Sequence, residues 1–71
     1  MKIERLIKMA NDIGDFFNAE SDKALAAEGV KQHILRSWDP RMRQAIIRYC
    51  QEDGSALSDL AKTAILNLDL S

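Results

Sequence analysis

Apolar residues recur every three to four positions along most of the chain, which is the spacing of one face of an α-helix. The first such stretch runs from about residue 2 to residue 18. Its apolar stripe consists of Ile3, Leu6, Ile7, Ala10, Ile13 and Phe17, with Met9 and Phe16 at its edges. At about 100° per residue this stripe spans roughly 180°, so part of it can face another chain. Gly14 lies near the stripe, where either a close helix approach or simple tolerance explains it.

Two further helices are predicted on either side of an Asp-Pro pair. Ser21 is a suitable N-cap for the first of them, and Gly29 weakens its middle. The apolar face of this helix is formed by Ala27, Val30, Ile34 and Trp38. It ends before Asp39, because the residue preceding a proline avoids the helical region. Asp39 then fits an N-cap and Pro40 the first position of a helix that continues to about Glu52.

The remaining pattern predicts a fourth helix. The inner face of the helix before it is formed by Met42, Ala45, Ile46, Tyr49 and Cys50. Gly54 stands where a helix-ending glycine is expected, and Ser55 or Ser58 can cap the helix that follows, to about Leu68. Its apolar side consists of Leu57, Leu60, Ala61, Ala64, Ile65 and Leu68. The expected fold class is therefore all-α, a small bundle of three to four short helices in a single domain of residues 1–71.

The 71 residues include one cysteine and one histidine, which limits the chemistry available to the chain. Cys50 has no disulfide partner, and Cys50 with His33 cannot complete a four-ligand zinc site. We expect Cys50 to be a buried structural thiol and His33 to lie at the edge of the core; a contact to a partner or a pH-sensitive role are the alternatives for His33. No phosphate-binding loop or nucleophile–base set is evident. We therefore expect no catalytic residues, no metal site and no cofactor.

Charge is unevenly distributed, although the formal net charge is only −1. Residues 31–48 contain five Lys or Arg side chains against Asp39 alone, whereas residues 1–30 and 49–71 are acidic. This dipolar pattern suits docking on a charged partner, with an internally compensated surface as the alternative. Bulk attraction to nucleic acid or anionic lipid is not indicated. Charged residues near the start disfavour a signal peptide, and no apolar run approaches the ~20 residues that span a bilayer, so we expect a cytoplasmic protein.

The basic middle of the chain contains the candidate partner interface. The residues assigned to it are His33, Trp38, Arg41, Arg43, Ile47 and Arg48. On the third predicted helix, Arg41, Gln44 and Arg48 share one face, and Arg43 and Ile47 lie one turn apart on another strip. Arginine beside exposed apolar side chains is typical of protein interfaces.

Three of these assignments carry specific structural expectations. Ile47 falls off the inner stripe, so we expect it at the surface. Trp38 belongs either to the interface or to the core as an anchor. Arg43 is expected to be a surface residue, whose replacement by glutamate weakens docking and leaves the fold nearly intact.

Two segments also carry a family resemblance. Residues 6–17 read LIKMANDIGDFF, and residues 30–43 end in WDPRMR. They resemble the delta subunit of NAD-dependent, molybdenum-containing formate dehydrogenases, whose opening reads roughly L-hydrophobic-x-M-A-N-x-I-x-x-F-F and whose second block ends in W-D/E-P-R-M-R. Together the segments cover over a third of the chain. Ser37 stands where that block commonly has an aromatic residue, and the acidic C-terminal segment matches the family only loosely.

The resemblance implies a small accessory subunit of a cytoplasmic, multi-subunit enzyme. In that family the large subunit carries the molybdopterin guanine dinucleotide cofactor and iron–sulfur clusters, and other subunits carry FMN and the NAD site. The delta subunit carries no redox centre and supports assembly and quaternary structure. The expected partner is therefore the large molybdenum-binding subunit, with other subunits of the complex as further candidates. Neither nucleic acid nor a membrane is expected as a partner.

Two alternatives come from other functional classes. The first is a small helical DNA-binding module in which the helix starting at Pro40 presents Arg41, Gln44 and Arg48 to a groove. The acidic flanks and the net charge of −1 weigh against it. The second is a stand-alone enzyme, which the lack of a nucleophile–base set disfavours.

Overall fold

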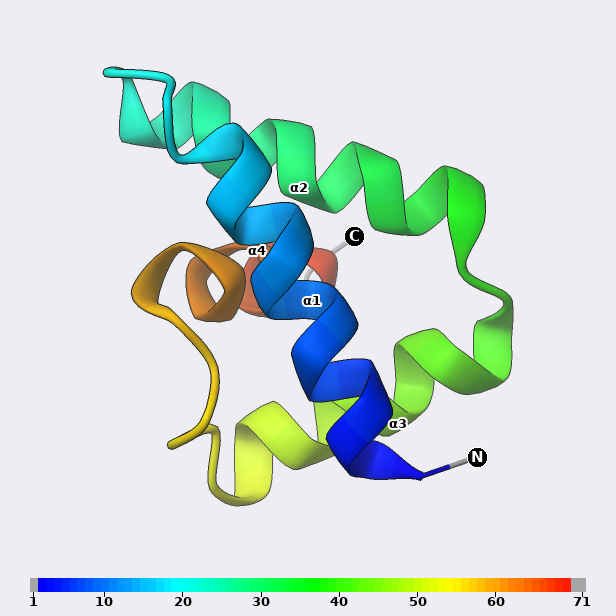
Figure 1. The fold of residues 1–71 in the computed structure, drawn as a ribbon. Helices are drawn as coiled ribbons and strands as arrows, with labels where there is room; N and C mark the ends of the chain where they lie inside the picture. The colour runs from blue at the N-terminus through cyan, green and yellow to red at the C-terminus, as the bar shows by residue number, and fades with distance from the viewer. Residues whose placement is uncertain (1, 70–71) are drawn as a thin grey trace.

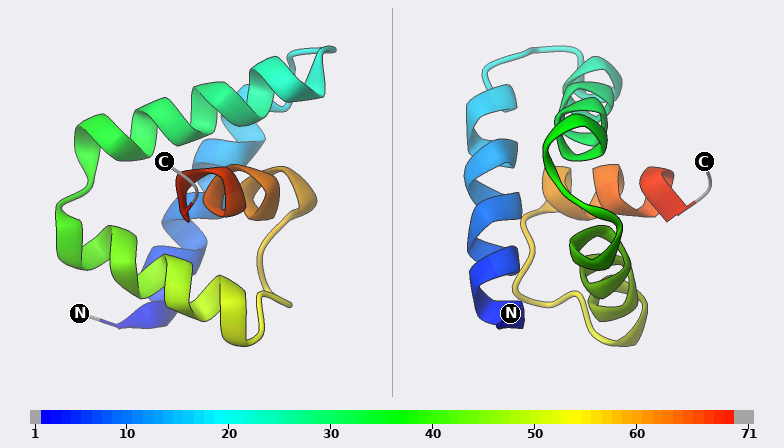
Figure 2. Two further views of the ribbon diagram at one scale, coloured as in Figure 1. Left: turned by 180° about the vertical axis from the view of Figure 1, so that it is seen from behind. Right: turned by 90° about the vertical axis from the view of Figure 1, so that its right-hand side faces the viewer.

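Four α-helices form the fold in the computed structural model, which describes residues 2–69. They are α1 (Ile3–Phe17), α2 (Lys23–Ser37), α3 (Pro40–Glu52) and α4 (Asp59–Asp69). Figure 1 shows α4 behind α1, with α2 on one side of it and α3 on the other. The side view in Figure 2 shows the same arrangement, and α4 packs against all three other helices. No strand occurs in the described residues, so the predicted all-α fold class is confirmed.

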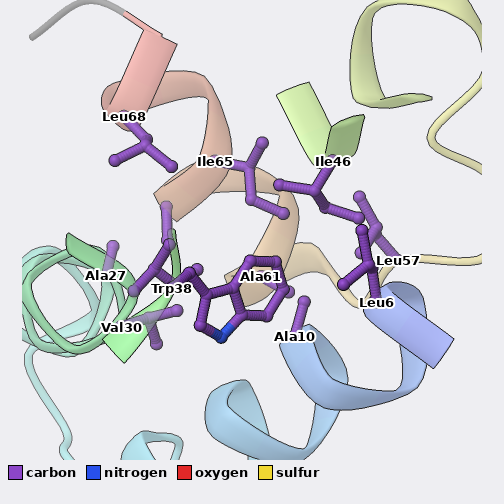
Figure 3. Close-up of a cluster of buried hydrophobic side chains, with 12 residues drawn as sticks. Leu6, Ala10, Ala27, Val30, Trp38, Ile46, Leu57, Ala61, Ile65 and Leu68 are labelled. Carbon is purple, nitrogen blue, oxygen red and sulfur yellow. The ribbon is translucent and has the colours of Figure 1, made fainter. Parts of the chain in front are cut away.

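The core lies where α4 meets the other three helices (Figure 3). Its buried members are Leu6, Ala10, Ala27, Val30, Ile34, Trp38, Ile46, Leu57, Ala61, Ala64, Ile65 and Leu68. These residues come from the apolar stripes predicted for each helix. Ala61 and Ala64 are small, and they let α4 approach its neighbours closely. The indole ring of Trp38 extends from the end of α2 into the middle of the cluster.

Two glycines mark places where helices come close together. A Cβ on Gly14 would lie 3.3 Å from Ser58 Oγ and 3.6 Å from the Ala61 Cβ, so close approach to the start of α4 explains this glycine. A Cβ on Gly29 would lie only 2.6 Å from two atoms of the Phe17 ring. Gly29 therefore makes room for Phe17 between α1 and α2. The sequence showed only that a glycine weakens the middle of this helix.

The start of α2 differs from the prediction by one residue. Asp22, and not Ser21, is the N-cap, and its Oδ1 accepts from the backbone N–H groups of Ala24 (3.0 Å) and Leu25 (3.3 Å). The helix begins at Lys23, so the extended backbone of Asp22 places its carboxylate beside the first free amides. The Ser21 assignment is therefore wrong. Serine and aspartate both suit an N-cap, and the spacing of apolar residues does not show which of two adjacent residues takes that position.

The loop between α3 and α4 is fixed at both ends. Gly54, at φ +72°, follows α3, and its N–H donates to the Tyr49 carbonyl oxygen at 3.1 Å. Ser58, one of the two predicted caps, accepts at Oγ from the Ala61 N–H at 3.3 Å. Asn11 of α1 holds the loop from the side, because its Oδ1 accepts from the Ser58 N–H at 2.8 Å and its Nδ2 donates to the Ala56 carbonyl at 2.9 Å.

Candidate partner interface

The corner between α2 and α3 positions the candidate interface. Trp38 is the C-cap of α2 and is only 4% exposed, so its side chain is a core anchor. Asp39 is the N-cap of α3, accepting at Oδ1 from the Met42 N–H at 3.0 Å, and Pro40 is the first helical residue. Of the two positions that the sequence left open for Trp38, interface or core anchor, the structure shows the core anchor, and this burial leaves almost no side-chain surface for a partner.

Arg43 belongs to the same corner. Its side chain is half-buried, and Nη1 donates to the Trp38 carbonyl oxygen at 2.8 Å. That carbonyl lies at the end of α2, where helical C=O groups lack helical partners and the helix dipole favours a cation. The structure thus corrects the expectation that Arg43 is a free surface residue, since its guanidinium bridges two helices.

Ile47 also differs from its expected position. It is half-buried and packs against the core, and it lines a shallow hollow together with residues of α2 and α4. The hollow is formed by Leu35, Pro40, Arg43, Gln44, Ile47 and Leu68. Ile47 lies off the inner stripe of α3, and Leu35 and Leu68 from neighbouring helices line the same hollow. Leu35 remains 37% exposed, so the hollow has an apolar edge.

The outer face of α3 is the exposed part of the predicted interface. Arg41, Gln44 and Arg48 are all exposed, and with Ala45 they line a groove of about 510 Å³ between α3 and the start of α1. The other residues lining this groove are Ile3, Tyr49 and Glu52. Neither arginine forms a salt bridge within residues 2–69. The salt bridge found in that range joins Lys8 and Asp12.

The six predicted interface residues are therefore not brought together on one surface. Arg41 and Arg48 lie in the groove on the outer face of α3, whereas Arg43 and Ile47 lie at the neighbouring hollow. His33 is half-buried on α2 and lines neither of them.

Two further large apolar side chains are exposed near the opposite corner, where α1 ends and α2 begins; the sequence pattern placed Phe16 at the edge of the apolar stripe and did not assign Leu25 to a face. Phe16 is 77% exposed and Leu25 is 61% exposed. The ring of Phe16 meets that of Phe17 edge-on, with centroids 5.2 Å apart. Phe17 in turn lies against Gly29 on α2, so the pair of aromatic rings reaches from α1 to α2.

The free thiol of Cys50 is half-buried on α3, and not fully buried as the sequence predicted. Burial raises the pKa of the Cys50 thiol, an effect that nearby Lys62 opposes and Asp69 reinforces. Cys50 is thus a neutral thiol near pH 7. Within residues 2–69, no three His, Cys, Asp or Glu side chains lie together as metal ligands. None of the helices in that range has the length and apolar character needed to cross a membrane.

Comparison with known proteins identifies the family. Searches of curated proteins and of solved structures give no match. The family model for the NADH-dependent formate dehydrogenase delta subunit matches residues 5–65, which include the segments 6–17 and 30–43 and reach into α4. The chain therefore belongs to the NADH-dependent formate dehydrogenase delta subunit family.

Proposed function

We propose that this chain is an accessory subunit that supports the assembly and quaternary structure of a cytoplasmic formate dehydrogenase. In this proposal it docks through the outer face of α3 on an acidic surface of the large, molybdenum-binding subunit. Family membership supports a role as one subunit among several and favours it over the alternative of a DNA-binding module.

The observation that carries the docking proposal is a pair of exposed arginines that form no salt bridge within residues 2–69. Arg41 and Arg48 border a groove that also contains apolar surface from Ile3 and Tyr49. A carboxylate of a partner can form a forked, charge-assisted pair with a guanidinium. Apolar surface beside the pair excludes water from it when the partner binds. Arg43 contributes indirectly, because its bond to the Trp38 carbonyl fixes the direction in which α3 leaves α2.

The exposed apolar side chains support a protein partner as well. Phe16 and Leu25 leave large apolar groups in water at the α1–α2 corner. Aromatic side chains such as that of Phe16 are enriched in protein interfaces. The proposed subunit contributes shape and charge to the complex, while cofactors are held by its partners.

Co-expression with the large subunit tests the docking proposal. The double variant Arg41→Glu/Arg48→Glu is expected to lower recovery of the large subunit with the tagged chain by about tenfold, because like charges then meet across the contact. The matched control is Arg5→Glu/Arg36→Glu, which changes net charge equally at exposed positions on α1 and α2. Wild-type recovery with the first variant, or equal loss with both, contradicts docking through this face.

A further inference from the structure

The groove on the outer face of α3 has the residue spacing of a socket for one side chain. Arg41, Gln44, Ala45 and Arg48 stand at positions i, i+3, i+4 and i+7 of one helix, and all four line the groove. Four residues at this spacing form the hole that receives a knob in knobs-into-holes packing of helices. Ala45 is the small member, so the hole is open at its centre.

We propose that this hole receives one apolar side chain from a helix of the partner, and that this helix carries two carboxylates seven residues apart, one on each side of the apolar residue. The inference rests on the proposed docking through α3 and specifies the chemistry of the partner segment. Ile3 and Tyr49 provide apolar contact for the inserted side chain, and Arg41 and Arg48 pair with the carboxylates.

The separation of the two arginines favours a helix over an extended strand. Seven residues of α3 correspond to about 10.5 Å along its axis. A partner helix repeats this distance between positions i and i+7, which lie on nearly the same stripe. On one face of a strand, alternate residues are about 6.6 Å apart and every fourth residue about 13 Å apart, so neither spacing matches.

Glu52 sets a limit at one end of the groove. It lies one turn beyond Arg48 and lines the same groove. A third carboxylate on the partner, one turn beyond the one that pairs with Arg48, would meet a like charge there. The favoured partner segment therefore has acidic residues at two positions only along this stripe, with an apolar residue three or four positions from each.

Titration of the isotope-labelled chain with synthetic helices tests the spacing directly. Two helical peptides of about 21 residues and identical composition are compared, with glutamates flanking one leucine either seven or five positions apart. The peptide whose glutamates are seven positions apart is expected to shift the amide resonances of residues 41–48. It is also expected to bind at least about fivefold more tightly than the peptide whose glutamates are five positions apart. Equal affinity, no binding, or shifts confined to other helices overturns the inference.

Filling the hole tests the knob separately from the charges. Ala45→Leu is expected to lower recovery of the large subunit about tenfold while Ala56→Leu, the same change at an exposed position in the α3–α4 loop, keeps it, and thermal unfolding shows whether each variant is folded. If Ala45→Leu is not folded, Gln44→Trp covers the hole from an exposed position instead. Full recovery with the filled hole, together with loss in Arg41→Glu/Arg48→Glu, overturns the helix inference and leaves the proposed function standing. Full recovery with all of them contradicts the proposed function itself.

Discussion

The hydrogen bond from Arg43 to the Trp38 carbonyl gives the sharpest prediction about this fold. Arg43→Met keeps most of the apolar stem and removes the donor, which leaves a half-buried carbonyl oxygen at the end of α2 without its 2.8 Å partner. Hydrogen bonds to charged groups contribute about 1.5–3 kcal/mol, so the free energy of unfolding should fall by about 2 kcal/mol. For a domain of this size, this corresponds to a drop in Tm of roughly 8–16 °C.

The assay is thermal unfolding followed by circular dichroism, with Arg41→Met as the matched control. Arg41 is exposed and lies on the same helix, two residues away, so its replacement should change stability by about 0.5 kcal/mol or less. Arg43→Glu should be less stable than Arg43→Met, because it places a carboxylate near the negative end of the α2 dipole. Identical melting of Arg43→Met and Arg41→Met would refute the structural role assigned to Arg43.

Four further predictions address other parts of the chain. Asp39→Ala should cost about 1 kcal/mol of stability and Asp39→Asn much less in thermal unfolding, because asparagine also accepts from the Met42 N–H; equal losses would mean that the charge matters and not the cap. Gly29→Ala should lower stability by about 1 kcal/mol despite its better helix propensity, and the added change Phe17→Leu should recover part of the loss; additive effects would contradict a clash between the two side chains. Cys50 should react with iodoacetamide more slowly in the folded chain than in urea near pH 8, because burial raises its pKa and lowers the thiolate fraction; equal rates would contradict this. The purified chain should contain no stoichiometric molybdenum or iron and show no visible absorption band, as elemental analysis and a spectrum will report; a bound chromophore would contradict the proposed accessory role.

The helices could be predicted from sequence because their signals are local. Apolar positions at helical spacing define the inner faces, and the Asp39-Pro40 pair and Gly54 mark the start and end of α3. At α2 the signal was ambiguous, since Ser21 and Asp22 are both good caps and stand next to each other. Periodicity defines the face of a helix more firmly than it defines the terminal residue.

The environment of the candidate site could be predicted only in part. Exposure of Arg41 and Arg48 follows from their position opposite the inner stripe of α3, which a helical wheel captures. Ile47 is partly buried against the core, and the hollow that it lines also takes in Leu35 and Leu68 from two other helices. No property of α3 alone shows how those helices cross it, so the helical wheel did not show that Ile47 also packs against the core.

Most residues of the string WDPRMR, which carries much of the resemblance to the family, build the corner between α2 and α3. Trp38 anchors the core, Asp39 caps α3, and Pro40 fixes its first turn. Arg43 crosses back to the Trp38 carbonyl, and Met42 is half-buried against the core. Arg41 is the member of the string that faces outward into the groove. Substitutions in the string should therefore affect folding at most positions and docking at Arg41, so only variants on the outer face of α3 separate the two effects.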